Sequence, residues 1–86
     1  MALFAEFLGT FALTTAFLFT GNWLIIAITL GVIGWTIGSI SGANVNPALT
    51  FAMWLKGTFP VQKVLSYYAV QFLGAAAAYY TYAALT

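Results

Sequence analysis

The sequence predicts an all-α membrane protein with three transmembrane helices and one re-entrant half-helix. Of the 86 residues, 64% are hydrophobic and 3% are charged, and no charged side chain lies between Glu6 and Lys56. A soluble domain does not leave so much apolar surface without a polar face. The second observation is an Asn-Pro pair at residues 46–47, which starts a short helix inside this apolar sequence.

Two apolar runs precede this pair, and each is long enough to cross a bilayer. The first covers residues 3–20 and ends at a Gly-Asn turn sequence. The second covers residues 23–40 and begins at Trp23, where an interfacial aromatic anchor is expected. Because no basic residues precede the first run, we interpret it as mature protein rather than as a cleaved signal peptide.

The short helix is expected over residues 47–56. At ~1.5 Å per residue, about ten residues span ~15 Å, which is half of a ~30 Å hydrocarbon core. Asn46 suits the N-cap and Pro47 the first helical position, whereas Lys56 and Gly57 suit the C-terminal end. A half-spanning helix with a polar lead-in must line a cavity within protein, because lipid cannot satisfy its backbone groups. This pattern indicates part of a pore.

A third span is expected over residues 61–85, which completes a single unit over residues 1–86 with no linker and no second domain. If the N-terminus is cytoplasmic, Lys56 and Lys63 lie on the cytoplasmic side, as the positive-inside rule favours. This bias depends on two lysines only and is weak, so insertion in both orientations, or dual topology, stays open. We expect an integral protein of the cell (inner) membrane.

Small residues recur at four-residue spacing along the expected spans, and such ridges let helices approach closely in lipid. Examples are Ala5 with Gly9, Gly34 with Gly38, and Gly74 with Ala78. We interpret these steps as ordinary helix packing. A pore-widening role is the alternative for Gly34.

The inventory of residues argues against catalysis. Cysteine, histidine and aspartate are absent, and Glu6 is the only carboxylate, so a metal site lacks ligands and an acid–base pair lacks a partner. A net charge of +1 provides no basic patch for nucleic acid. We therefore expect no enzyme activity, no metal, no cofactor and no nucleic-acid partner.

Three segments, in order and at matching spacing, resemble the aquaporin and glycerol-facilitator family, also called major intrinsic proteins. Residues 5–10 (AEFLGT) resemble the start of the family's first helix, and residues 67–75 (YYAVQFLGA) resemble the third. Residues 41–50 (SGANVNPALT) contain the signature triplet Asn46-Pro47-Ala48. Family members have six spans in two inverted repeats, each with a half-helix, so this chain resembles one repeat. It resembles the first repeat, because Leu49 follows the triplet where second repeats usually carry Arg.

The resemblance implies that Asn46 donates from its side-chain amide to water or glycerol in the pore. The carbonyl groups of Gly42, Ala43 and Asn44 would accept hydrogen bonds beside it. The N-terminal end of the half-helix carries roughly +0.5 of an elementary charge, which disfavours cations and hydronium at the membrane centre. The alternative for Asn46 is a helix cap without solute contact.

Two polar residues of the spans are expected to support this loop. Glu6 resembles the family's buried glutamate, which accepts hydrogen bonds from the half-helix loop, and Gln71 would brace polar backbone in the same way. An intramembrane carboxylate is also a functional candidate in general. A proton relay is therefore the alternative role for Glu6.

Counting from the triplet assigns the family's narrow filter to four residues. These are Ile26, Gly34, Ala43 and Leu49. None is aromatic, histidine or arginine, whereas by resemblance a water-specific member carries bulky and charged groups there. The filter is therefore expected to be wide and apolar, and to admit glycerol, urea or ammonia as well as water. Packing against lipid or neighbouring helices is the alternative role.

The predicted function is a passive transmembrane channel for water and small neutral solutes such as glycerol. One half-helix reaches only the midplane, so two copies would associate in opposite orientations, as inverted repeats do within one chain. The resemblance further implies a tetramer of such pairs, or eight chains. Two alternatives stay open. One is a half-pore completed by a separate second-repeat chain, or a fragment of a six-span channel, and the other is a non-channel carrier or assembly protein.

Overall fold

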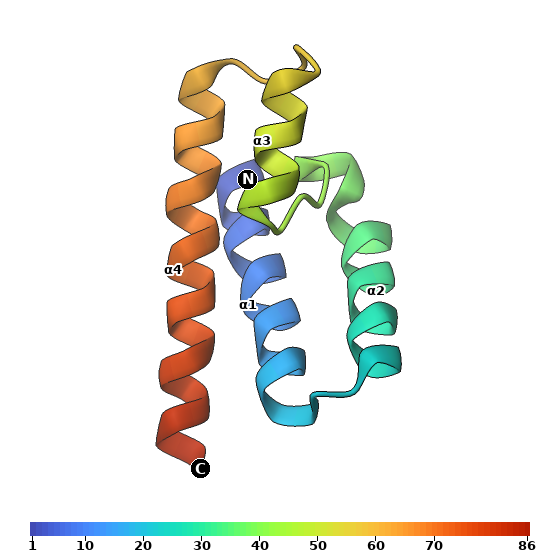
Figure 1. Ribbon diagram of the computed structural model, residues 1–86, viewed down its shortest axis with the longest axis vertical. Helices are drawn as coiled ribbons and strands as arrows, with labels where there is room; N and C mark the ends of the chain where they lie inside the picture. The colour runs from blue at the N-terminus through green and yellow to red at the C-terminus, as the bar shows by residue number, and fades with distance from the viewer.

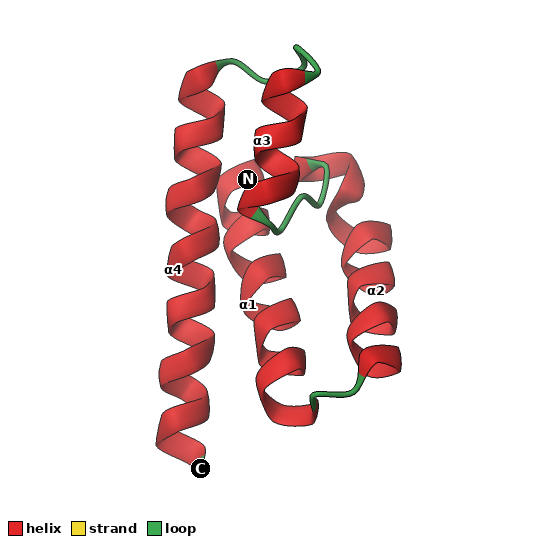
Figure 2. Cartoon of the chain, viewed as in Figure 1, coloured by secondary structure: helices red, strands yellow, loops and turns green.

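The computed structural model describes residues 1–86 and contains four helices and no strands (Figures 1 and 2). The helices are α1 (Ala2–Thr20), α2 (Trp23–Ser41), α3 (Pro47–Leu55) and α4 (Val61–Leu85). The predicted all-α class is confirmed.

The ends of the helices follow the turn chemistry of the sequence. Gly21, in the left-handed region at φ 55°, ends α1. Asn22 begins α2, because its side chain accepts hydrogen bonds from the backbone N–H groups of Leu24 and Ile25 at 2.9 and 3.0 Å. The first two expected spans match α1 and α2 to within one residue at each end.

One boundary of the half-helix was predicted one residue too late. Helix α3 ends at Leu55, and Lys56 is its cap rather than its last residue. The next residue, Gly57, takes the left-handed conformation at φ 85° and turns the chain toward α4. A glycine is favoured there because it has no Cβ to clash in this region.

Helix α1 lies at the centre of the fold. It packs against α4 on one side and α2 on the other, whereas α3 packs against α4 (Figure 1). Helices α1 and α4 approach closely, because a Cβ added at Gly74 would lie 2.6 Å from the carbonyl oxygen of Phe7. The packing expected at Gly74 is confirmed. By contrast, Gly34 and Gly38 on α2 have no neighbour within 4 Å of such a Cβ, so only another chain or lipid can cover them.

Helices α1 and α2 are long and apolar enough to cross a membrane. Helix α4 is longer, with 25 residues, but carries all five tyrosines as well as Lys63 and Gln71. Hydropathy therefore identifies α1 and α2 as candidate spans, but it does not identify α4, the third expected span. Large apolar side chains are exposed on the outer faces, among them Trp35 at 86% and Trp23 at 78%. Such a surface needs lipid or another apolar chain as its surroundings.

The chain re-enters the fold at the short helix, as predicted. After α2 the chain forms a loop, and α3 then runs back along the first part of α4 (Figure 1). The Thr50 hydroxyl in the first turn of α3 accepts a hydrogen bond from Gln71 Nε2 at 2.8 Å. Since Gln71 lies well inside α4 (Val61–Leu85), the tip of α3 lies beside the middle of that helix.

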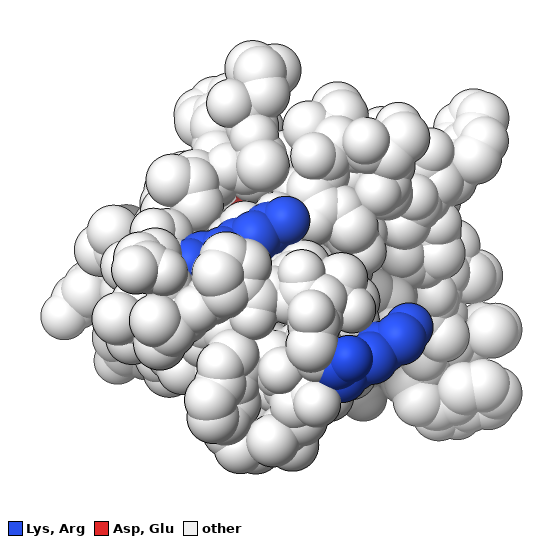
Figure 3. All heavy atoms as spheres, turned by 90° about the horizontal axis from the view of Figure 1, so that it is seen from above, with Lys and Arg blue, Asp and Glu red and all other residues white.

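The only two basic residues lie on one face of the molecule, where α3 ends and α4 begins (Figure 3). Both are exposed. The ammonium group of Lys63 lies 4.1 Å from the centre of the Phe59 ring, in a cation–π contact. Both charges therefore lie at the same end of the bundle.

Candidate pore site

A buried carboxylate holds the loop that precedes α3. Glu6 is 0% exposed, and each of its oxygens accepts two hydrogen bonds. Oε1 accepts from the backbone N–H of Val45 at 2.8 Å and from Gln71 Nε2 at 3.0 Å. Oε2 accepts from the Ser41 hydroxyl at 2.6 Å and from the backbone N–H of Asn44 at 3.0 Å. All four partners are donors, which suits an ionised carboxylate, because it can only accept.

These hydrogen bonds hold a backbone that is unfavourable by itself. Gly42, Ala43 and Val45 all have positive φ, at 86°, 49° and 44°. This region is uncommon for non-glycine residues and especially for β-branched ones such as Val45. Each such residue costs of order 1–3 kcal/mol and persists only where its surroundings impose it. Glu6 supplies that constraint, since it binds the N–H groups of two consecutive loop residues.

Further polar side chains that were not among the predicted site residues extend this network. Thr50 Oγ1 accepts from Asn44 Nδ2 at 3.2 Å and from Gln71 at 2.8 Å. The Tyr67 hydroxyl donates to the carbonyl oxygen of Ser41 at 2.8 Å. Thr50 and Ser41 carry a weak signal in the sequence, since they are polar residues that flank the Asn-Pro motif. Tyr67 lies in the segment 67–75 that resembles the family's third helix, but nothing in the sequence separates it from Tyr68.

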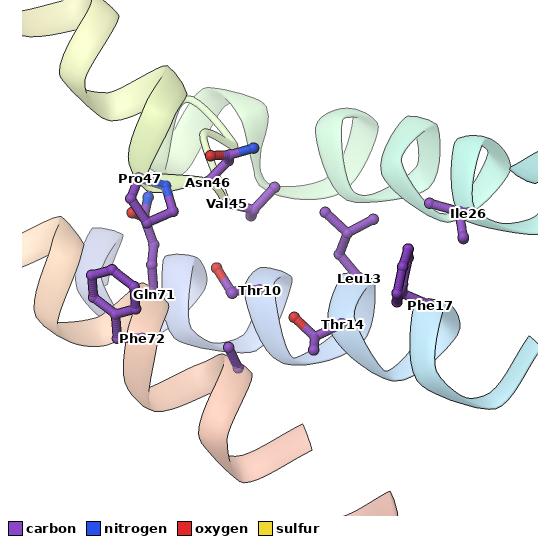
Figure 4. Close-up of a pocket in the computed structure, with 11 residues that line it drawn as sticks. Thr10, Leu13, Thr14, Phe17, Ile26, Val45, Asn46, Pro47, Gln71 and Phe72 are labelled. Carbon is purple, nitrogen blue, oxygen red and sulfur yellow. The ribbon is translucent and has the colours of Figure 1, made fainter. Parts of the chain in front are cut away.

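Asn46 precedes α3, and the two atoms of its side-chain amide have different roles. Its Oδ1 accepts a hydrogen bond from the backbone N–H of Ala48 at 2.8 Å, which makes it the N-cap of α3. Its Nδ2 donates no hydrogen bond within the chain, and the residue is exposed. Figure 4 shows the amide oxygen directed toward the start of α3 and the nitrogen directed away from it. A free donor therefore stands at the positive end of a helix.

A partly open cavity of about 410 Å³ begins at this tip. It runs between α1, α4 and the start of α2, with Asn46 and Val45 at one end and Phe17 and Ile26 at the other (Figure 4). The wall is mainly apolar, interrupted by polar side chains from α1 and α4. The complete lining is Thr10, Leu13, Thr14, Phe17, Ile26, Val45, Asn46, Pro47, Gln71, Phe72 and Ala75.

The predicted site residues divide between this cavity and its surroundings. Asn46, Pro47 and Gln71 line the cavity, and Glu6 lies behind the loop without lining it. Ala48, Gly42, Ala43 and Asn44 do not line it either, although the carbonyl groups of the last three accept no hydrogen bond within the chain.

Of the four residues assigned to the narrow filter, Ile26 lines the cavity. Gly34 lies on an exposed face of α2, and Leu49 is 51% exposed on α3. Ala43 is half-buried in the loop, where its N–H donates to the Ser41 hydroxyl at 3.1 Å. One chain by itself does not bring these four residues together.

The fold and this site define an integral membrane protein with a re-entrant helix whose capped N-terminus opens on an internal cavity. The comparisons with known proteins give the class a name. The family model of the major intrinsic proteins matches residues 18–86. The chain belongs to this family. No solved structure gave a significant match.

Several curated relatives are similar in sequence. The probable aquaporin AqpM of Archaeoglobus fulgidus is 40% identical over 60 residues, which cover 65% of this chain and 24% of that protein. The propanediol uptake facilitator PduF of Salmonella typhimurium is 42% identical over 89 residues, covering 83% of this chain and 32% of that protein. The glycerol uptake facilitator protein of Bacillus subtilis is 38% identical over 61 residues, covering 66% and 22%.

The chain thus spans between about a fifth and a third of the length of these relatives. Their names are those of an aquaporin and two uptake facilitators and not of enzymes, which agrees with the prediction that the chain has no enzymatic activity.

Proposed function

We propose that two copies of this chain, inserted in opposite orientations, form a passive channel for water and small neutral solutes such as glycerol. The observation that carries this proposal is the tip of α3. A free amide donor and a helix N-terminus face a cavity that leads along α1, while the chain contains only one such helix. An inverted second copy would supply the other half-helix and cover the open side of the cavity.

Transport follows from the chemistry of the cavity lining. A solute entering a narrow pore loses contacts with water, and fixed donors and acceptors replace them. Asn46 Nδ2 provides a donor, and the unpaired carbonyl groups of Gly42, Ala43 and Asn44 provide acceptors nearby. The positive end of α3 disfavours cations. Neutral molecules that both donate and accept hydrogen bonds are therefore the favoured solutes.

Pairing would also assemble the filter. Gly34 and Leu49 lie on exposed faces of one chain, so only a second chain can bring them to a common lumen with Ile26 and Ala43. The open space at Gly34 and Gly38 offers a face on which another helix can approach closely. A tetramer of such pairs, with eight chains, extends the proposal to the assembly.

Osmotic experiments on the purified chain test the proposal. In reconstituted liposomes, stopped-flow light scattering should show rapid volume changes with water and with glycerol. Asn46→Ser keeps a capping oxygen but removes the amide donor. Each lost hydrogen bond is worth about 1 kcal/mol, or about fivefold in rate, so the two copies in one pore should lose roughly 25-fold in permeability.

Asn22→Ser is the matched control, because Asn22 also caps a helix with its side chain but does not line the cavity. This variant should conduct as the unmodified chain does. A tag on the C-terminus should be accessible from both sides of conducting vesicles. If all copies in such vesicles share one orientation, the inverted pair is refuted.

The chain covers only part of the length of its relatives. This favours one other arrangement, in which a separate second-repeat chain, or the rest of a six-span protein, completes the pore. The two arrangements differ in one simple result. The purified chain conducts without a partner only if copies of itself complete the pore. Conduction that appears only after a second chain is added would establish the heteromeric pore.

A further inference from the structure

Two buried oxygen atoms beside the cavity have no hydrogen-bond partner within the chain. They are Thr10 Oγ1 and Gln71 Oε1. Thr10 is 5% exposed and Gln71 1%, and both side chains line the cavity. Nearly all buried polar atoms in proteins are paired, so each exception needs an explanation. We propose that these two oxygens form a binding site for one hydroxyl group, of water or of an alcohol solute, beside the tip of α3.

The orientation of the Gln71 amide is fixed by its other end. Its Nε2 donates to Glu6 Oε1 at 3.0 Å and to Thr50 Oγ1 at 2.8 Å. Exchanging the nitrogen and the oxygen would turn the amide oxygen toward a carboxylate, which accepts only. Oε1 therefore takes the remaining position, and as a pure acceptor it requires a ligand that donates.

Thr10 differs from most of the other threonines of the long helices. The hydroxyl groups of Thr15, Thr29, Thr36 and Thr81 each donate to the carbonyl oxygen four residues earlier. Thr10 Oγ1 makes no such bond, although it is buried. A threonine hydroxyl can donate and accept. A ligand hydroxyl that donates to Gln71 Oε1 and accepts from Thr10 satisfies both atoms.

The close packing of α1 and α4 holds the two side chains at one level. A Cβ added at Gly74, one turn after Gln71, would lie 3.2 Å from Thr10 Cβ. Figure 4 shows the Thr10 hydroxyl and the Gln71 amide pointing to the same side of their helices, toward the loop that carries Val45 and Asn46. The free donor of Asn46 lines the same cavity.

The site suits a hydroxyl group better than a metal cation. Hard cations such as Ca²⁺ and Mg²⁺ take six or more oxygen ligands, whereas two unpaired protein oxygens are present here. The positive end of α3 and the Asn46 donor lie along the same cavity and also oppose a cation. Binding does not require a second chain, but a part in conduction rests on the proposed channel function.

Isotope-edited infrared spectroscopy of the whole chain in lipid nanodiscs tests the binding step. The sequence has two glutamines, so a ¹³C label on glutamine side chains in a Gln62→Asn background reports on Gln71 alone. A bound hydroxyl should lower the stretching frequency of that carbonyl relative to Thr10→Val, and Thr10→Ser should restore it. Thr15→Val is the matched control, because that hydroxyl bonds only to its own helix and does not line the cavity.

The spectra also identify the source of the hydroxyl group. A low frequency in water alone that 1,2-propanediol leaves unchanged identifies water, whereas a further shift on adding the diol identifies the solute. Equal frequencies in the unmodified chain and in Thr10→Val, with and without the diol, would overturn the proposal. So would a frequency that changes when sodium replaces choline, because the ligand would then be a cation.

Permeability separates this proposal from the channel itself. In conducting liposomes, Thr10→Val should lower permeability to the bound species roughly 25-fold, because each of the two copies in a pore loses one hydrogen bond worth about fivefold, and Thr15→Val should not. If liposomes do not conduct but the carbonyl band responds to Thr10→Val, the channel fails and the site stands. If they conduct and neither readout responds, the site fails alone.

Discussion

Replacing Glu6 by glutamine tests whether the carboxylate holds the loop before α3. The amide has the same shape but accepts with one atom and donates with the other. If its NH₂ took the place of Oε1, it would face two donors, Val45 N–H and Gln71 Nε2. If the NH₂ took the place of Oε2, the Ser41 hydroxyl could turn and accept a hydrogen bond from it, but the backbone N–H of Asn44 can only donate. The better orientation thus leaves one buried N–H unpaired.

That loss sets the size of the effect. An unsatisfied buried donor costs about 1–3 kcal/mol, so Glu6→Gln should lower the free energy of unfolding by that amount. Glu6→Ala leaves the N–H groups of Asn44 and Val45 both unpaired, and should lower it by about 2–6 kcal/mol. The positive φ angles of Ala43 and Val45 would then lose their constraint, so the loop should rearrange.

Titration with sodium dodecyl sulfate in mixed micelles, followed by circular dichroism, measures these differences. Thr36→Val is the control, because its hydroxyl bonds only to the backbone of its own helix and the residue is exposed. It should change the free energy of unfolding by less than about 0.5 kcal/mol. If both Glu6 variants also stay within that range, the buried network does not hold the loop and the reasoning is wrong.

Two further predictions use the same titration. Gly74→Ala should destabilise the fold by about 1–3 kcal/mol, because the added methyl group meets the backbone oxygen of Phe7 at 2.6 Å, whereas Gly31→Ala should be neutral or stabilising by up to about 1 kcal/mol. Tyr67→Phe should cost about 1 kcal/mol, because it removes the hydrogen bond to the buried carbonyl oxygen of Ser41.

Each of these has a result that would contradict it. If Gly74→Ala and Gly31→Ala had equal free energies of unfolding, α1 and α4 could move apart to fit the added methyl group without losing stability. For Tyr67→Phe, the osmotic permeability of liposomes is measured as well as the free energy of unfolding. Unchanged stability together with unchanged permeability would show that the hydroxyl supports neither the end of α2 nor the loop.

Local sequence signals predicted the helices well because they depend on neighbouring residues. The Gly21-Asn22 turn and the Asn46-Pro47 start act within a few residues of the chain, and both lie where they were expected. The end of α3 at Leu55 rather than Lys56 was missed, since a cap and a last helical residue differ only in backbone geometry. Hydropathy marked α1 and α2 but not the tyrosine-rich α4.

The candidate site was predictable only in part. Glu6 and Gln71 were predicted because residues 5–10 and 67–75 resemble helices of the family, and Glu6 also because it is the only carboxylate of an apolar chain. Asn46 was predicted because it precedes a proline. Tyr67 and Thr10 lie in the same two segments, but nothing in the sequence predicted their roles. The hydrogen bond of Tyr67 joins residues 26 positions apart, and the free hydroxyl of Thr10 differs from those of other threonines only in its surroundings.

The amino-acid sequence is enough to predict a helical, apolar chain that is interrupted once by a short capped helix, because periodicity, hydropathy and capping are properties of local segments. Two facts could be seen only in the folded chain. Glu6 binds the N–H groups of loop residues 38 and 39 positions later, and two oxygens beside the cavity stay unpaired. Those facts depend on how closely α1 and α4 approach, and the contact of Gly74 with a distant backbone sets that distance.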